Sequence, residues 1–214
     1  LGIDKIEVGV GPKIRPRATS GWLREISPTY QLIDIERRKD GQIDSRYIDY
    51  QILFTFQDGT FIEYGLNTNV ENPDEPFTIN HERDIAIAPG RYEFDEQFVE
   101  VRTNQSAPLW LTGRYSTGEF YDGHKRTYLI GATARVGLHL NLSGTLTRND
   151  IEVSNGAFTT DLLAARVNYN FSTTMFLNSL LQYNTDARQF SSNIRFNIIH
   201  RPLSDLFLVY NERR

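Results

Sequence analysis

Hydrophobic and polar side chains alternate with a period of two along much of the chain, most regularly between residues 156 and 210. In the stretch 190–198 the odd positions are polar or charged, and the even ones are mainly apolar. Because successive side chains of a β-strand point to opposite faces of a sheet, the pattern predicts strands with one apolar and one polar face. The apolar face must meet either a protein core or a lipid bilayer.

The alternation predicts about twelve β-strands, and no segment shows a helical period. Asp-Gly turns, such as that at residues 39–42, are expected to join some of them. Residues 11–27 are expected to be irregular, and residues 67–90 to form a long loop with a short strand at 85–88. The strands expected before residue 150 are 3–10, 30–38, 48–56, 62–66, 92–102, 109–117, 128–136 and 138–147.

The expected connections in the second half of the chain alternate in length. Short joints are expected at 136–138, 171–175 and 201–204, and longer or more polar ones at 119–124, 148–159 and 184–189. Short turns on one side and longer loops on the other are typical of outer-membrane barrels, whose strands of about ten residues cross the bilayer. The aromatic residues expected at the membrane interfaces are Tyr115, Tyr128, Tyr169, Phe171, Tyr183, Phe190 and Tyr210.

We therefore predict a single all-β domain over residues 1–214, an antiparallel up-and-down transmembrane β-barrel with about twelve strands in this chain. If the joint at 201–204 lies in the periplasm, the last strand runs outward, and Arg214 should lead into an external loop and a returning strand. The chain is accordingly expected to be an incomplete portion of a larger barrel. A soluble sandwich or lipocalin-like barrel that binds a ligand in its interior is the alternative.

Composition is consistent with both folds, because half of each barrel strand faces a polar lumen. Hydrophobic residues make up 39% of the 214 residues, and the mean hydropathy is -0.44. No run approaches the roughly 18 to 20 apolar residues of a membrane-spanning helix. The net charge of -4 comes without a basic stripe, so nucleic acid is not an expected partner. With zero cysteines there is no thiolate metal site, and no metal or cofactor is expected.

The polar faces of four different expected strands carry Arg114, Arg135, Arg166 and Arg195. Facing lipid costs a charged side chain about 2 to 4 kcal/mol near the bilayer midplane, so these should point into the lumen. Two interpretations stay open, a basic ladder that attracts anionic solutes and an internal polar network that plugs a narrow barrel. The network would include Asn168, Asn193 and Asn197. Trp110 on the same face could stack on a sugar ring or a base, or it could fill space beside Arg114.

His139, Asn141 and Ser143 share one face of an expected strand, and these are the residue types of membrane-embedded Ser-His-Asn hydrolases. A nucleophile and its base must lie within about 3 Å of each other. Residues two apart on a strand are about 7 Å apart, so cross-strand partners would be required. We favour ordinary lining of a polar lumen for these three residues. A hydrolase that uses lumen or loop residues remains an alternative.

A set of loop and turn motifs spanning residues 75–212 resembles a known family. The motifs are EPF at 75–77, APGRY at 88–92, GEFYDG at 118–123, NGAFTT at 155–160, LQYN at 181–184, IHRP at 199–202 and DLFLVYNE at 205–212. In this order they resemble the C-terminal barrel region of uncharacterised Gram-negative outer-membrane proteins. Members of that family carry an N-terminal module similar to family-nine carbohydrate-binding domains.

The resemblance implies a β-barrel in the bacterial outer membrane and a periplasmic carbohydrate-module-like domain outside this chain. It supports the fold more than any chemistry, so the role is left as transport, binding or anchoring. The expected partners are outer-membrane lipid, a small solute or glycan, and other subunits of an outer-membrane assembly.

Overall fold

The computed structural model describes residues 2–16, 21–201 and 204–214. Its strands are β1 (Ile3–Val10), β2 (Leu23–Arg37), β3 (Ile43–Phe56), β4 (Phe61–Glu71), β5 (Phe77–Asn80), β6 (Ile85–Ile87), β7 (Tyr92–Arg102), β8 (Leu109–Phe120), β9 (Gly123–Val136), β10 (Leu140–Val153), β11 (Gly156–Ser172), β12 (Met175–Asn184), β13 (Gln189–Arg201) and β14 (Ser204–Arg213). The predicted all-β class and antiparallel up-and-down order are confirmed.

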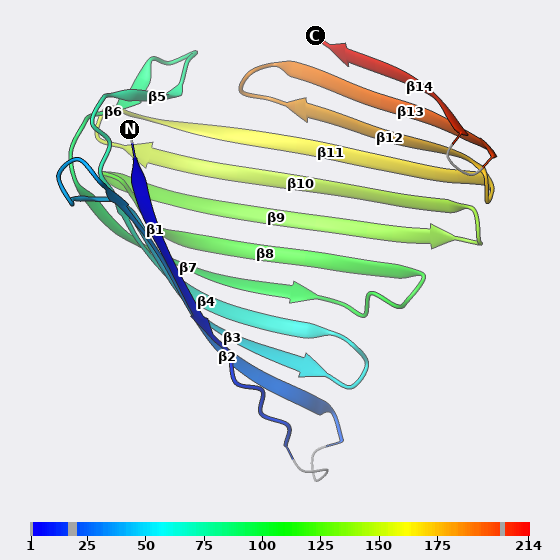
Figure 1. The fold of residues 1–214 in the computed structure, drawn as a ribbon, viewed down its shortest axis with the longest axis horizontal. Coiled ribbons are helices and arrows are strands. Elements are labelled where there is room, and N and C mark those ends of the chain that lie inside the picture. The colour runs from blue at the N-terminus through cyan, green and yellow to red at the C-terminus, as the bar shows by residue number, and fades with distance from the viewer. Residues whose placement is uncertain (1, 17–20, 202–203) are drawn as a thin grey trace.

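Twelve of these strands form one curved sheet, in which each strand pairs with its neighbour along the chain, and β4 pairs directly with β7 (Figure 1). The two outermost strands, β1 and β14, each have one partner in the described residues, so the sheet is open. β5 and β6 form a separate two-stranded hairpin at one end of the sheet. The strands therefore form an up-and-down sheet that does not close on itself within the described residues.

Curvature gives the sheet two chemically different faces. Polar and charged side chains crowd together on the concave face, where Glu100 and Ser116 are 8% and 3% exposed. Their apolar neighbours on the convex face stay open, with Val99 at 40% and Ile130 at 62% exposed. This distribution is the reverse of that in a water-soluble domain, in which apolar side chains fill the interior.

The expected alternation of short and long connections is wrong at two of the three longer joints. The structure continues β8 to Phe120 and β10 to Val153, which leaves tight turns at 121–122 and 154–155. The expected joint at 201–204 includes residues 202–203, which lie outside the described residues. The strands themselves are therefore longer at this end of the sheet, which we call the extended rim.

Two further segments are more regular than the sequence suggests. β2 begins at Leu23, because residues 23–27 pair with the far end of β3, and Ile14 forms an isolated bridge with Ile26. Within the expected loop at 67–90, β4 continues to Glu71 and the β5–β6 hairpin follows. The expected short strand at 85–88 corresponds to β6.

The hairpin folds against the concave face of the extended rim. Ile85 and Ile87 form a small buried core with Val153 and Phe158 of β10 and β11. Asn80 reaches farther along the rim and donates from Nδ2 to Asp186 Oδ1 at 2.7 Å, in the turn between β12 and β13. The hairpin thus connects segments that are far apart in the chain and covers one end of the polar concave surface.

Candidate functional site on the concave face

A buried ion cluster occupies the concave face where β7 and β8 meet. Glu100 lies opposite Arg114 in the strand register and accepts a hydrogen bond from its Nη1 at 3.2 Å. The second carboxylate oxygen accepts from Arg102, and the Arg114 guanidinium also lies 3.7 Å from the centroid of the Phe98 ring. Because Glu100 is buried, these two cations compensate a carboxylate that water barely reaches.

Two unsatisfied oxygens lie near this cluster, on β3 and β4. Asp49 and Asn67 pair across the strands and are 5% and 7% exposed. Asp49 accepts a hydrogen bond from Gln51, but its Oδ1 and the Oδ1 of Asn67 have no partner in the described residues. Buried polar atoms normally have hydrogen-bond partners. This part of the concave face therefore has spare acceptor capacity for a donor such as water.

The second half of the concave face carries the arginines and asparagines that the sequence singled out. Strand register places Arg135, Asn141, Asn168, Asn178 and Arg195 in one lateral row across β9 to β13. Side chains directly opposite each other in such pairs share a face and lie about 5 Å apart. The row is a continuous strip of amide groups with a guanidinium at each end.

A second row lies next to the first, one step along the strands. It contains Trp110, Thr133, Ser143, Arg166, Leu180 and Asn193, in that order from β8 to β13. Asn193 donates to Asn211 of β14, and Asn197 lies farther along β13 with its Oδ1 unpartnered in the described residues. Most of the predicted lumen residues therefore lie in these two adjacent rows. The rows follow from the register of the paired strands and are not apparent from the sequence.

The expected internal network explains only one of the four arginines. Arg114 has its carboxylate, whereas Arg135, Arg166 and Arg195 have no ion-pair partner in the described part of the chain. Arg135 lies 4.8 Å from the centroid of Trp110, and Arg195 lies 5.0 Å from that of Phe207. Trp110 thus packs with Arg135 and not beside Arg114.

Charge is segregated across the concave face. The flank formed by β2 to β7 carries the carboxylates Glu25, Asp49, Glu63, Glu71, Glu96 and Glu100. The flank formed by β9 to β13, which we call the basic flank, carries arginines. The acidic residues of the same strands, Asp150, Glu152 and Asp161, lie on the convex face. The sequence pattern identified the arginines but missed the acidic flank. The period-two placement of glutamates on the polar faces of β4 and β7 could have revealed it.

The structure does not assemble the three residues considered for hydrolysis. Asn141 and Ser143 lie on β10, but His139 lies in the preceding turn. The His139 Nδ1 is 2.7 Å from the carbonyl oxygen of Asn170. No hydrogen bond joins the three side chains in the described residues, so the arrangement offers no activated nucleophile.

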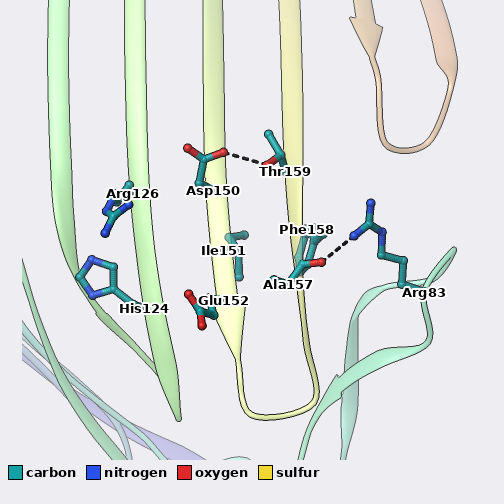
Figure 2. A pocket seen from close by; sticks show the side chains of 9 residues that line it. All are labelled: Arg83, His124, Arg126, Asp150, Ile151, Glu152, Ala157, Phe158 and Thr159. Atoms are coloured by element: carbon teal, nitrogen blue, oxygen red, sulfur yellow. Dashed lines mark hydrogen bonds between the residues drawn. The ribbon is translucent and has the colours of Figure 1, made fainter.

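A polar pocket of about 410 Å³ lies on the extended rim, between β9, β10, β11 and the β5–β6 loop (Figure 2). His124 and Arg126 face Glu152 and Asp150 in register. Arg83 closes one side by donating to the carbonyl oxygen of Ala157 at 2.6 Å. Acidic and basic groups balance here, so this pocket has less charge preference than the basic flank.

Two groups at the rim have pKa values displaced by their surroundings. In the segment after β4, a hydrogen bond from Arg37 lowers the pKa of Asp74, and the charge of that guanidinium adds to the effect. In the turn between β8 and β9, burial raises the pKa of the Tyr121 phenol. Tyr121 packs against Tyr92 and Phe77, with ring centroids 5.2 and 5.4 Å apart. Both groups help hold the segment between β4 and β7 against the rim.

Among the described residues, no group of three or more His, Cys, Asp or Glu side chains is placed to hold a metal ion. None of these residues belongs to a helix with the length and apolarity needed to cross a membrane. The sequence matches no protein-family model and no curated protein, and no solved structure matches the fold.

Proposed function

We propose that these strands form part of the wall of an antiparallel transmembrane β-barrel in a bacterial outer membrane, with the concave face lining a polar lumen. The observation that carries the proposal is the reversed placement of side chains, with carboxylates buried inside and branched apolar residues open outside. A soluble ligand-binding barrel would bury the apolar set instead. The role of such a barrel is the binding or passage of solutes through its lumen, or the anchoring of an attached domain.

The apolar band on the convex face has the dimensions of a bilayer. It extends from Tyr128 to Val136 on β9 and from Leu163 to Phe171 on β11. Outward-facing side chains in these ranges are all uncharged. A tilted strand needs roughly 9 to 11 residues to cross the hydrocarbon core, so the band matches one crossing.

Aromatic side chains lie at both margins of the band, as membrane interfaces favour. Tyr115 and Tyr128 pair across β8 and β9 with ring centroids 5.1 Å apart, just before the charged extended rim. At the other margin, Tyr169 and Phe171 of β11 pack with centroids 4.7 Å apart. This spacing supports a membrane core between the two margins.

Membrane insertion would require the open sheet to close. Unpaired backbone groups on a strand edge cannot be left in hydrocarbon, so β1 and β14 must gain partners before the wall is complete. We propose that further strands supply these partners and that the barrel is larger than the twelve strands. On the basis of the motif resemblance at residues 75–212, we also propose that a periplasmic carbohydrate-module-like domain is attached to the barrel and that outer-membrane lipid surrounds it.

The test is to express the full-length natural protein in a Gram-negative host and fractionate its envelope. We expect it in the outer-membrane fraction, resistant to alkaline extraction and soluble only with detergent. Unheated samples should also migrate differently from boiled ones in detergent gels, because closed barrels resist unfolding by detergent. A monodisperse protein purified without detergent would refute the proposal.

A further inference from the structure

We infer that the basic flank, the concave face of β9 to β13, binds small oxyanions, meaning solutes that carry carboxylate, phosphate or sulfate groups. The inference deepens the proposed function and rests on it only in treating the concave face as a lumen. It names the class of solute that this surface selects. Three arginines, Arg135, Arg166 and Arg195, and the polar side chains between them form this binding surface.

These three arginines keep their charge available. Each lacks a carboxylate partner in the described residues, in contrast to Arg114, which Glu100 neutralises. The contacts of Arg135 with Trp110 and of Arg195 with Phe207 engage a ring face and leave the positive charge uncompensated. An arriving anion therefore displaces no internal carboxylate.

Spacing spreads the charges along a track. Arg135, Arg166 and Arg195 lie on every second strand, about 10 Å apart across the sheet. Arg166 also lies in the second row, about 7 Å along the strands, so successive arginines are separated by roughly 12 Å. An anion midway between two of them is about 6 Å from each, within the screening length of about 8 Å at physiological salt, so both attract it. The planar guanidinium also matches the geometry of oxyanions through paired hydrogen bonds.

The groups between the arginines are hydrogen-bond donors or small polar side chains. Asn141, Asn168 and Asn178 fill the row between Arg135 and Arg195, and each amide can donate to an anionic oxygen. The acidic flank on β2 to β7 repels the same anion. Binding is accordingly confined to the side of the concave face where β9 to β13 lie.

Trp110 provides a reporter, because the chain has two tryptophans and the other, Trp22, lies outside the concave rows. In a Trp22→Phe background, quenching of Trp110 is compared for iodide and caesium, at equal ionic strength and in detergent. Iodide quenches indole intrinsically more strongly than caesium does, so each constant is divided by that of free N-acetyltryptophanamide. We expect the normalised iodide constant to exceed the normalised caesium constant about threefold or more, as Arg135 concentrates anions there. Sulfate that replaces chloride should compete with iodide and lower its constant.

The Arg135→Gln/Arg166→Gln/Arg195→Gln variant should bring the ratio of normalised iodide to normalised caesium quenching close to one. The ratio cancels any change in Trp110 emission caused by loss of Arg135. A charge-matched control, Lys39→Gln/Arg126→Gln/Arg188→Gln, removes three cations from turns and the convex face and should keep the wild-type ratio.

An unchanged ratio in the triple variant, or a lack of competition by sulfate, would overturn the inference. If the triple variant does not fold, the single Arg166→Gln change provides the same test, with a smaller expected fall in the ratio. Quenching requires only a folded chain in detergent. A failure of membrane insertion would therefore appear in envelope fractionation and leave this readout intact.

Discussion

The Phe98 ring on β7 lies directly opposite Gly65 on β4 and fills the space that this glycine leaves empty. A Cβ atom at position 65 would be 2.3 Å from Phe98 Cε1. Arg114 stacks on the same ring and is held there by Glu100. The absence of one side chain on β4 thus determines how the buried ion cluster is assembled.

We expect Gly65→Ala to destabilise the protein by about 1 to 3 kcal/mol, the usual cost of overpacking a filled site. Phe98 must move away from the new methyl group, and Arg114 then loses its ring contact. Denaturant unfolding of the protein refolded into lipid vesicles measures the change. Gly113→Ala is the matched control, because a Cβ there meets nothing within 4 Å, and its stability should stay within about 0.5 kcal/mol of wild type.

Removal of the negative charge of Glu100 should also lower the free energy of unfolding. Glu100→Gln leaves Arg102 and Arg114 facing each other without their shared carboxylate, and we expect a loss of about 2 to 3 kcal/mol because both arginines are partly open to solvent. Adding Arg114→Gln should recover part of the loss, giving a coupling energy of about 1 kcal/mol or more in a double-mutant cycle.

The exposed Lys5–Glu7 pair is the control for this cycle. Glu7→Gln should change the free energy of unfolding by less than about 1 kcal/mol, as exposed pairs usually do. Additive effects of Glu100→Gln and Arg114→Gln would show that the two side chains do not interact energetically.

Sequence patterning was most informative where one strand face is apolar and the other polar. The strand at 92–102 was predicted with the bounds that the structure gives β7, and the turn at 39–42 contains Gly41 with a φ of 68°. At the extended rim the polarity of the two faces reverses, because Val153 and Phe158 pack under the hairpin on the concave side. Arg148, Asp150 and Glu152 face outward beyond the apolar band, so the end of β10 resembled a polar loop.

The composition of the candidate site was predictable, but its geometry was not. Alternation placed Arg135, Arg166 and Arg195 on the polar face, yet only the register of five strands aligns them with the asparagines. The partner of Arg114 was also missed, because Glu100 precedes it by an irregular connection that sets the β7–β8 pairing. Both the alignment of the arginines with the asparagines and the pairing of Arg114 with Glu100 depend on long-range strand pairing, which is not apparent from local sequence.

The β5–β6 hairpin should open without unfolding of the sheet. Ile87 is 2% exposed and belongs to the small core at the rim, so Ile87→Ala should weaken that core by about 2 to 4 kcal/mol. We expect trypsin to cleave after Arg83 faster than in wild type, while the gel migration of the unheated protein stays unchanged. Phe77→Ala, at a position 37% exposed, should have a smaller effect. Unfolding of the whole sheet by Ile87→Ala would contradict the independence of the hairpin.

A positive charge placed on the convex face distinguishes lipid from water as its surroundings. Ala132 lies near the middle of the apolar band on β9 and is already exposed, so Ala132→Lys removes little packing. In a bilayer it should cost about 2 to 4 kcal/mol, whereas in water it would be almost neutral.

The matched change Ala157→Lys lies on β11 at the extended rim, beside Glu152, and should cost less than about 1 kcal/mol in either medium. Unfolding free energies from lipid vesicles compare the two variants directly. Equal costs would mean that position 132 does not face hydrocarbon, because the same chemical change differs here only in depth along the strand. A large difference that vanishes in mild detergent without a bilayer would instead locate the penalty in the lipid itself.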